Sequence, residues 1–229
     1  MPAAGELVLH HLNASRSKRV LWLLEELGAP YSVRAYLRVR GRAPPELTAV
    51  HPLGKSPVLT DGGEVVAESG HIVEHLLETR DAGRVLQPAA DDTAGRAAHS
   101  YFLHYVEGSL SPLLLMDVVL GAVVDATPWP LRPVTRGVRD AVYANFVGPE
   151  LDRHAAYLEG VLASRDYIAC ARFTAADTHL HSAVEAMLGG DRALARAAAS
   201  PRLAAYCARL KERPAYLRAT AKDKELEMK

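Results

Sequence analysis

The sequence predicts two parts of different structural class, an α/β domain followed by an all-helical domain. Over roughly the first eighty residues, short runs of alternating apolar residues are interspersed with runs in which apolar residues recur every three or four positions. After Thr93 only the helical spacing continues, and clusters of proline and glycine interrupt it. We therefore place the first domain at 1–82, a linker at 83–92 and the helical domain at 93–229.

The first domain is expected to follow the order βαβαββα, which is the thioredoxin-like layout. Alternation predicts strands at 7–12, 31–37, 58–60 and 64–66, and helical spacing predicts helices at 17–27, 46–50 and 69–77. Asp61-Gly62-Gly63 joins the last two strands as a hairpin, because glycine accepts the positive φ that such turns need. In the second domain, helices are predicted to about residue 217, with breaks at 128–133, Pro149, 189–190 and 200–201.

Charge and cysteine content argue against several kinds of partner. The 27 basic residues balance the 27 acidic ones, so no net field favours nucleic acid or an anionic membrane. Residues 1–12 lack the features of a signal peptide, and no apolar run approaches the roughly 18 residues that span a bilayer. Cys170 and Cys207 lie at neither metal-type nor redox-type spacing, and the histidines offer no complete set of ligands. We expect a cytoplasmic protein without a metal.

Ser15 occupies the position where the first strand meets its helix and where thioredoxin-like redox proteins carry Cys-x-x-Cys. A hydroxyl at a helix N-terminus lies beside unpaired backbone amides that favour an anion, so it can donate a hydrogen bond to a bound thiolate. The alternative is that Ser15 only caps the helix, as serines commonly do.

Two further motifs suggest a peptide-like ligand. In His51-Pro-Leu-Gly-Lys-Ser-Pro57, a proline that enters an edge strand is a candidate cis bond, which would leave the backbone of Ser56 free to pair with an extended peptide. Glu68-Ser69 ends a strand and begins a helix, where the two residues can bind an ammonium and a carboxylate. The alternatives are an ordinary edge-strand proline, a solvated Lys55 and a plain helix start.

Taken together, Ser15-Arg16-x-x-Arg19, the 51–57 motif and Glu68-Ser69 resemble the cytosolic glutathione transferases. The segments 11–27, 42–47 and 105–110 are most similar to the fungal and bacterial branch with a serine-type site. The resemblance implies that Ser15 activates the glutathione thiol, with Arg16 adding positive charge beside it. It implies glutathione-binding roles for Lys55 and Arg42 at carboxylates, for Ser56 before Pro57 at the cysteinyl group, and for Glu68 and Ser69 at the γ-glutamyl group.

The resemblance extends to the helical domain. Phe173-Thr-Ala-Ala-Asp177 resembles the family's capping box, although Thr178 stands where the family usually has an apolar residue. One stripe of the helix that begins at Thr93 is predicted to line an apolar electrophile pocket, the alternative being plain core. Its members are Tyr101, His104, Tyr105, Ser109, Leu113 and Met116.

The expected function is a glutathione S-transferase that stabilises the glutathione thiolate for attack on an electrophilic, mostly apolar second substrate. The resemblance implies a homodimer, glutathione as co-substrate, no other cofactor and no nucleic-acid or membrane partner. Two alternatives stay open at this point. One is glutathione-dependent reduction of organic hydroperoxides, and the other is a non-catalytic glutathione-binding regulatory or interaction protein.

Overall fold

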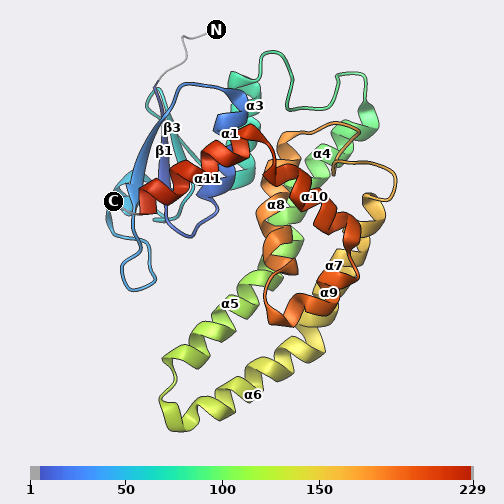
Figure 1. Cartoon of the computed structure of the whole chain (residues 1–229). Helices are drawn as coiled ribbons and strands as arrows, with labels where there is room; N and C mark the ends of the chain where they lie inside the picture. Colours follow the sequence, from blue (N-terminus) through green and yellow to red (C-terminus); the bar gives the residue numbers. More distant parts are fainter. Residues whose placement is uncertain (1–5, 228–229) are drawn as a thin grey trace.

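A mixed four-stranded sheet forms the centre of the N-terminal half (Figure 1). In the computed structural model, which describes residues 6–227, the strand order is β2-β1-β3-β4. Strand β1 pairs in parallel with β2, whereas the β1–β3 and β3–β4 pairs are antiparallel. The elements are β1 Leu7–Leu12, α1 Ser17–Leu27, β2 Ser32–Tyr36, α2 Glu46–Val50, β3 Val58–Asp61, β4 Glu64–Ala67 and α3 Ser69–Arg80. The predicted order βαβαββα is confirmed.

Local sequence accounts for these elements. Helix α1 buries Val20, Leu21 and Leu24 completely, and it ends at Gly28, whose φ of 61° is left-handed. In the β3–β4 hairpin, Gly62 and Gly63 have φ values of 57° and 95°, which a side chain would strain. Burial of one face of α1 and these left-handed turns thus fix the helix and the hairpin of this domain.

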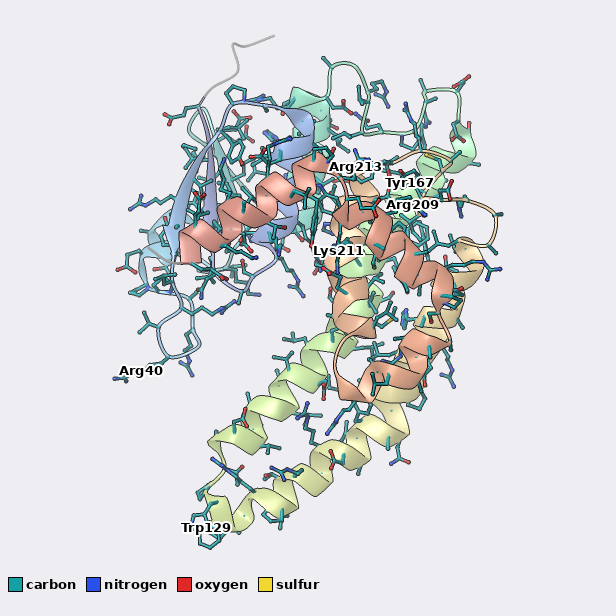
Figure 2. All side chains as sticks on the ribbon, viewed as in Figure 1. Arg40, Trp129, Tyr167, Arg209, Lys211 and Arg213 are labelled. Carbon is teal, nitrogen blue, oxygen red and sulfur yellow. The ribbon has the colours of Figure 1, made fainter. Side chains whose placement is uncertain are left out.

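The C-terminal half contains helices joined by loops, and no strand among its described residues. Its helices are α4 Thr93–Tyr105, α5 Ser111–Ala126, α6 Arg132–Val142, α7 Gly148–Val161, α8 Ala175–Leu188, α9 Leu194–Ala198, α10 Pro201–Lys211 and α11 Pro214–Glu227. Two π-helical turns, Val106–Leu110 and Tyr143–Val147, join α4 to α5 and α6 to α7. Helices α5 and α6 project as a long hairpin, with Trp129 at its tip (Figures 1 and 2).

Two helix boundaries differ from the predictions. Pro149 does not interrupt a helix, because it occupies the first turn of α7, directly after a π-helical turn, where proline is tolerated. The last helix does not stop near residue 217 but continues to Glu227. It returns to the first domain and packs along α1 (Figure 1). Arg213 and Arg218 anchor it there through ion pairs to Glu26 (2.6 Å) and Glu25 (2.8 Å).

The continuous helix Thr93–Ala126 also corrects an expectation. It spans 34 residues and contains an 18-residue window with a mean hydropathy of 1.7, of which 22% is buried. By length and composition alone it passes the test for a membrane-spanning helix, so the expectation that no apolar run approaches that length was wrong. In this fold its second half carries Asp117, which pairs with Arg139 of α6 at 3.0 Å.

The predicted capping box lies at the centre of the helical domain. Asp177, fully buried, accepts from the amide of Thr174 (2.7 Å), and the reciprocal capping-box bond is present. The same carboxylate accepts from the Ile168 amide (2.9 Å) and the Tyr206 hydroxyl (3.0 Å). Thr178 satisfies its hydroxyl by donating to the Ala175 carbonyl at 2.8 Å. The hydrogen bonds of Asp177 thus connect α8 to the preceding loop and to α10.

Buried histidines predict loss of stability in mild acid. Burial lowers the pKa of His99 to about 4, and burial likewise lowers that of His181 to about 4. Between pH 6.5 and 4 the unfolded chain therefore binds protons that the folded chain excludes, so stability falls as pH falls. Lowering the pH from 6 to 5 should decrease the free energy of unfolding by about 2 kcal/mol from these two groups. Urea titrations at both pH values measure this difference.

A matched pair of variants isolates one histidine. His99→Gln should remove about 1 kcal/mol of that difference, whereas His71→Gln, at an exposed position, should leave it unchanged. If the free energy of unfolding depended on pH equally in the wild type and in His99→Gln, this would contradict the assignment of the acid sensitivity to His99.

Candidate active site

A cleft of about 740 Å³ lies between the two domains, and a cavity of about 80 Å³ adjoins it. The β1–α1 junction and the segment before β3 supply one wall of the cleft, and α5 and α8 supply the other. Both hollows are lined by Arg16, Lys55 and Ser56. An elongated ligand can thus run from the small cavity into the larger cleft.

Ser15 is half-buried on the cleft wall, immediately before α1. Its Oγ accepts from the Ser17 amide at 3.2 Å and so satisfies the first amide of α1, although the N-cap position itself is Arg16. The Ser15 hydroxyl also lies 2.7 Å from Ser17 Oγ, so its proton is available to a ligand when Ser17 is the donor between the two hydroxyls. Thus one geometry accommodates both interpretations of Ser15, as a partner of the helix start and as a donor to an anion.

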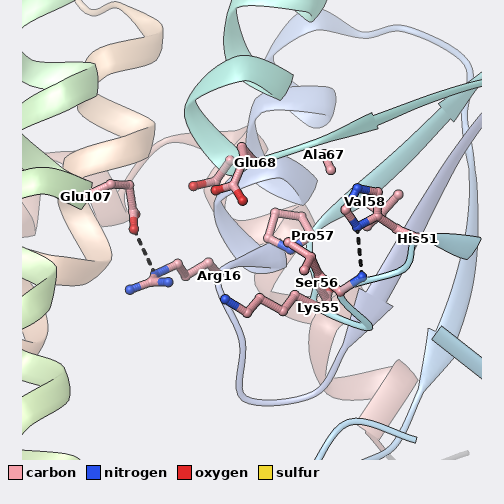
Figure 3. A pocket seen from close by; sticks show the side chains of 11 residues that line it. Arg16, His51, Lys55, Ser56, Pro57, Val58, Ala67, Glu68 and Glu107 are labelled. Carbon is pink, nitrogen blue, oxygen red and sulfur yellow. Dashed lines mark hydrogen bonds and ion pairs between the residues drawn. The ribbon is translucent and has the colours of Figure 1, made fainter. Parts of the chain in front are cut away.

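The residues before β3 line the same region (Figure 3). The Ser56–Pro57 peptide is cis, as predicted. The Ser56 side chain is anchored to β1, donating to the His10 carbonyl (2.9 Å) and accepting from the Leu12 amide (3.2 Å). Among the described residues, the backbone of Ser56 makes no backbone hydrogen bond, which leaves it free for an extended ligand. Lys55 is exposed at the mouth of both cavities.

Glu68 and Ser69 also line the small cavity, and Figure 3 shows Glu68 there. Glu68 has a φ of 70°, a conformation that costs a non-glycine residue roughly 1–3 kcal/mol and that is frequent at binding sites. Its exposed carboxylate makes no capping bond to α3. Ser69 is buried in the first turn of α3, where backbone amides lack helical partners. An acceptor and a set of donors therefore lie side by side.

Glu107 is a residue of this site that the sequence motifs did not identify. It lies in the first π-helical turn, lines the small cavity and pairs with Arg16 at 3.2 Å (Figure 3). It also pairs with Arg19, which is 6% exposed and donates to Ser182 at 2.6 Å. These contacts join the two domains across the site. The available signal was the single acidic residue in the stretch 105–110.

Arg42 does not lie where it was predicted. The backbones of Val39 and Arg42 pair across a turn (2.9 and 3.0 Å), which places Gly41 on the cleft and the exposed Arg42 outside its lining. Arg38 lines the cleft instead, and its guanidinium donates to the carbonyls of Asn13 and Ala14. Arg40 of the same loop projects away from the protein (Figure 2).

The predicted electrophile pocket also requires correction, because none of its six residues is among the residues that line the cleft. Tyr101 and Tyr105 pack against Tyr157 of α7, and Leu113 belongs to the core. His104, Ser109 and Met116 are exposed elsewhere. The α5 face that does line the cleft is shifted by one or two positions along the helix. It consists of Ser111, Leu114, Leu115 and Val118, opposite Ser182, Ala183 and Ala186 of α8.

Neither cysteine belongs to the site. Cys170 lies outside both cavities, and burial raises the pKa of Cys207 to about 12. Within residues 6–227, no group of three or more His, Cys, Asp or Glu side chains is arranged to hold a metal.

Comparison with known proteins identifies the family. Residues 9–84 match the glutathione S-transferase N-terminal domain, and residues 137–218 match the glutathione S-transferase C-terminal domain. Glutathione S-transferase 3 of Schizosaccharomyces pombe is 39% identical over 76% of this chain and 71% of its own length. Glutathione S-transferase 1 of Saccharomyces cerevisiae is 35% identical over 74% of this chain and 75% of its own length.

A solved structure of a glutathione S-transferase has the same fold. A glutathione S-transferase from Actinobacillus pleuropneumoniae superposes with a TM-score of 0.71 at 29% identity, covering 95% of this chain and 93% of that one. Together with the two domain matches and the fungal relatives, this similarity shows that the chain belongs to the glutathione S-transferase family.

Proposed function

We propose that glutathione binds along the wall formed by the segment before β3, with its thiol beside Ser15. The observation that carries this proposal is the position of these residues in two adjoining hollows. Ser15 lines the larger cleft, Glu68 and Ser69 line the small cavity, and Lys55 and Ser56 line both. Glu68 and the amides at the start of α3 suit the ammonium and carboxylate of the γ-glutamyl group. The backbone of Ser56 suits the cysteinyl amide, and Lys55 suits the glycine carboxylate.

In the proposed reaction, the Ser15 hydroxyl and the N-terminus of α1 stabilise the thiolate form of bound glutathione. The thiolate sulfur attacks an electrophilic carbon held in the cleft, a carbon–sulfur bond forms, and the leaving group departs with its electron pair. Catalysis then consists of thiolate stabilisation and of holding the two reactants together. Glutathione serves as co-substrate, and the proposal includes no other cofactor.

Turnover assays test this function. We expect saturable glutathione binding and formation of the thioether product with 1-chloro-2,4-dinitrobenzene, an apolar aryl halide. A parallel assay with cumene hydroperoxide distinguishes peroxide reduction, an alternative that the comparisons do not favour. Glutathione binding without turnover of either substrate would contradict the catalytic proposal.

The corrected face of α5 predicts where the second substrate binds. Leu115→Ala should raise KM for an apolar electrophile about three- to tenfold, because it removes roughly 1 kcal/mol of apolar contact. Met116→Ala is the matched control, since this neighbouring apolar side chain lies outside the cleft lining. Steady-state kinetics with each substrate varied in turn measure both effects. A larger effect of Met116→Ala would restore the original assignment of the pocket.

We also propose a homodimer in the cytoplasm. Exposed apolar side chains on the α5–α6 hairpin and its tip support an interface between chains, among them Trp129, which is 81% exposed. Light scattering tests the assembly, and a mass of one chain would contradict it.

A further inference from the structure

A line of polar contacts leads from Ser15 into the protein, and the proposed reaction has not used it. Ser15 Oγ lies 2.7 Å from Ser17 Oγ, and Ser17 Oγ lies 2.9 Å from Nδ1 of His11. On the other side of the ring, Nε2 of His11 lies 3.2 Å from Oδ1 of Asp223, within ion-pair distance although off the line of an aligned hydrogen bond. Four residues, from β1, the turn that follows it, α1 and α11, thus form one continuous chain of polar groups.

The interior part of this line is shielded from water. Ser17 is 0% exposed and His11 is 1% exposed, whereas Ser15 reaches the cleft. Asp223 of α11 is the charged group that faces His11, and Lys18 of α1 pairs with the second oxygen of the same carboxylate at 3.6 Å. On β2, the residue in register with His11 is the uncharged Ala35. Although burial opposes it, the contacts with His11 and Lys18 lower the pKa of Asp223, so this carboxylate is ionised at neutral pH.

The hydrogen-bond directions depend on the protonation of His11. When the ring is neutral with its proton on Nε2, facing Asp223, Nδ1 accepts from Ser17, and Ser17 in turn accepts from Ser15. When the ring carries both protons, Nδ1 donates to Ser17, Ser17 donates to Ser15, and the Ser15 proton is released toward the cleft. Only the second arrangement leaves Ser15 as a donor to sulfur.

We propose that His11 accepts the glutathione thiol proton through Ser15 and Ser17, with Asp223 as the counter-charge. The inference rests on the proposed function, because it requires the thiol to lie beside Ser15. The sulfur–hydrogen bond breaks toward Ser15 Oγ, the Ser15 proton passes to Ser17 Oγ, and the Ser17 proton passes to Nδ1. The products are a thiolate that accepts from Ser15 and an imidazolium beside Asp223, with no proton gained or lost overall.

Hydroxyl, imidazole and carboxylate follow each other here in the order that serine hydrolases use, with one additional hydroxyl in the line. His11, Ser17 and Asp223 are positioning residues in this scheme, since only Ser15 reaches the substrate. A consequence separates the scheme from simple thiolate stabilisation, because the thiol proton stays on the protein instead of passing to the buffer.

The test combines two readouts on the full chain at pH 7. Ultraviolet difference absorbance measures bound thiolate, and calorimetry in buffers of different ionisation enthalpy counts the protons released when glutathione binds. We expect a thiolate band in the wild type with far less than about one proton released per thiolate. In His11→Gln and Ser17→Ala, the thiolate band at pH 7 should fall about tenfold, and any thiolate formed at higher pH should release its proton to the buffer. Asp223→Asn should also weaken the thiolate band at pH 7.

His10→Gln is the matched control. His10 is the adjacent buried histidine, but its ring contacts Tyr36 (2.9 Å) and Thr60 (3.0 Å), so this variant should match the wild type. Ser17→Ala keeps the test valid should His11→Gln fail to fold, because it removes a single oxygen atom. About one proton released per thiolate in the wild type, or unchanged thiolate in Ser17→Ala, would overturn the relay while leaving the proposed function intact. Absence of any thiolate band in the wild type would overturn both.

Discussion

Replacing Ser15 with alanine is expected to lower kcat/KM for conjugation at pH 7 by about 10- to 100-fold, with glutathione affinity nearly unchanged. The variant removes one hydrogen bond to a negatively charged sulfur, worth roughly 1.5–3 kcal/mol. The tripeptide contacts at Lys55, Ser56 and Glu68 stay in place, so binding should persist. Steady-state kinetics and direct binding measurements separate the two quantities.

Two comparisons make the Ser15 result specific. Ser15→Thr keeps a hydroxyl and should retain more activity than the alanine variant. At pH values above the free thiol pKa, the alanine variant should recover much of its loss, since solvent then supplies the thiolate. Unchanged kcat/KM in Ser15→Ala would remove the serine from catalysis and leave Asn13, Arg16 or a water as the thiol activator.

Replacing Asp177 with alanine is expected to lower the free energy of unfolding by about 3–5 kcal/mol. The carboxylate is fully buried and accepts four hydrogen bonds, from two backbone amides and two hydroxyls. Its removal leaves the Ile168 and Thr174 amides without partners in the interior and deprives α8 of its cap. Urea or thermal unfolding followed by circular dichroism measures the loss.

Asp166→Ala is the control for Asp177. Its side chain is 77% exposed, and its ion pair with Arg209 is long, at 3.9 Å. Its removal should change stability by no more than about 0.5 kcal/mol. A loss of less than about 1 kcal/mol in Asp177→Ala, the cost of one ordinary helix cap, would show that these four hydrogen bonds contribute little to stability.

The N-terminal domain could be predicted from sequence because its elements follow local rules. Apolar alternation, helical spacing and the glycines at 28, 62 and 63 specify the strands, the first helix and the hairpin. Ser15, Ser56 and Glu68 were found for the same reason, since each belongs to a short motif at a strand–helix junction or a turn. All three lie on the cavities between the domains.

The electrophile pocket could not be predicted in this way. A stripe at helical spacing was extended from Tyr101 through Met116, but the π-helical turn Val106–Leu110 lies within it. One additional residue in a turn rotates everything that follows by about 100°, so Leu113 and Met116 do not continue the face of Tyr101 and Tyr105. Those two tyrosines, before the turn, pack against Tyr157 of α7 instead of facing the cleft. Nothing in the residue types marks that turn.

Asp223 and the last ten residues of α11 were missed for a different reason. The segment 218–227 is mostly polar or charged and carries no apolar stripe, so periodicity gives no helix signal. The helix forms because ion pairs to Glu25 and Glu26 of α1 fix it on the first domain. Local sequence patterns do not reveal such long-range pairing. For the same reason they do not reveal the contact between His11 and Asp223.

The central claim is that this protein binds glutathione as a thiolate at neutral pH, and ultraviolet difference spectra of the wild type titrated with glutathione across pH test it most directly. We predict a thiolate band whose midpoint lies about two pH units below the pKa of a free cysteine thiol, near 8.5. Glutathione bound only as the neutral thiol up to that pKa would contradict the account.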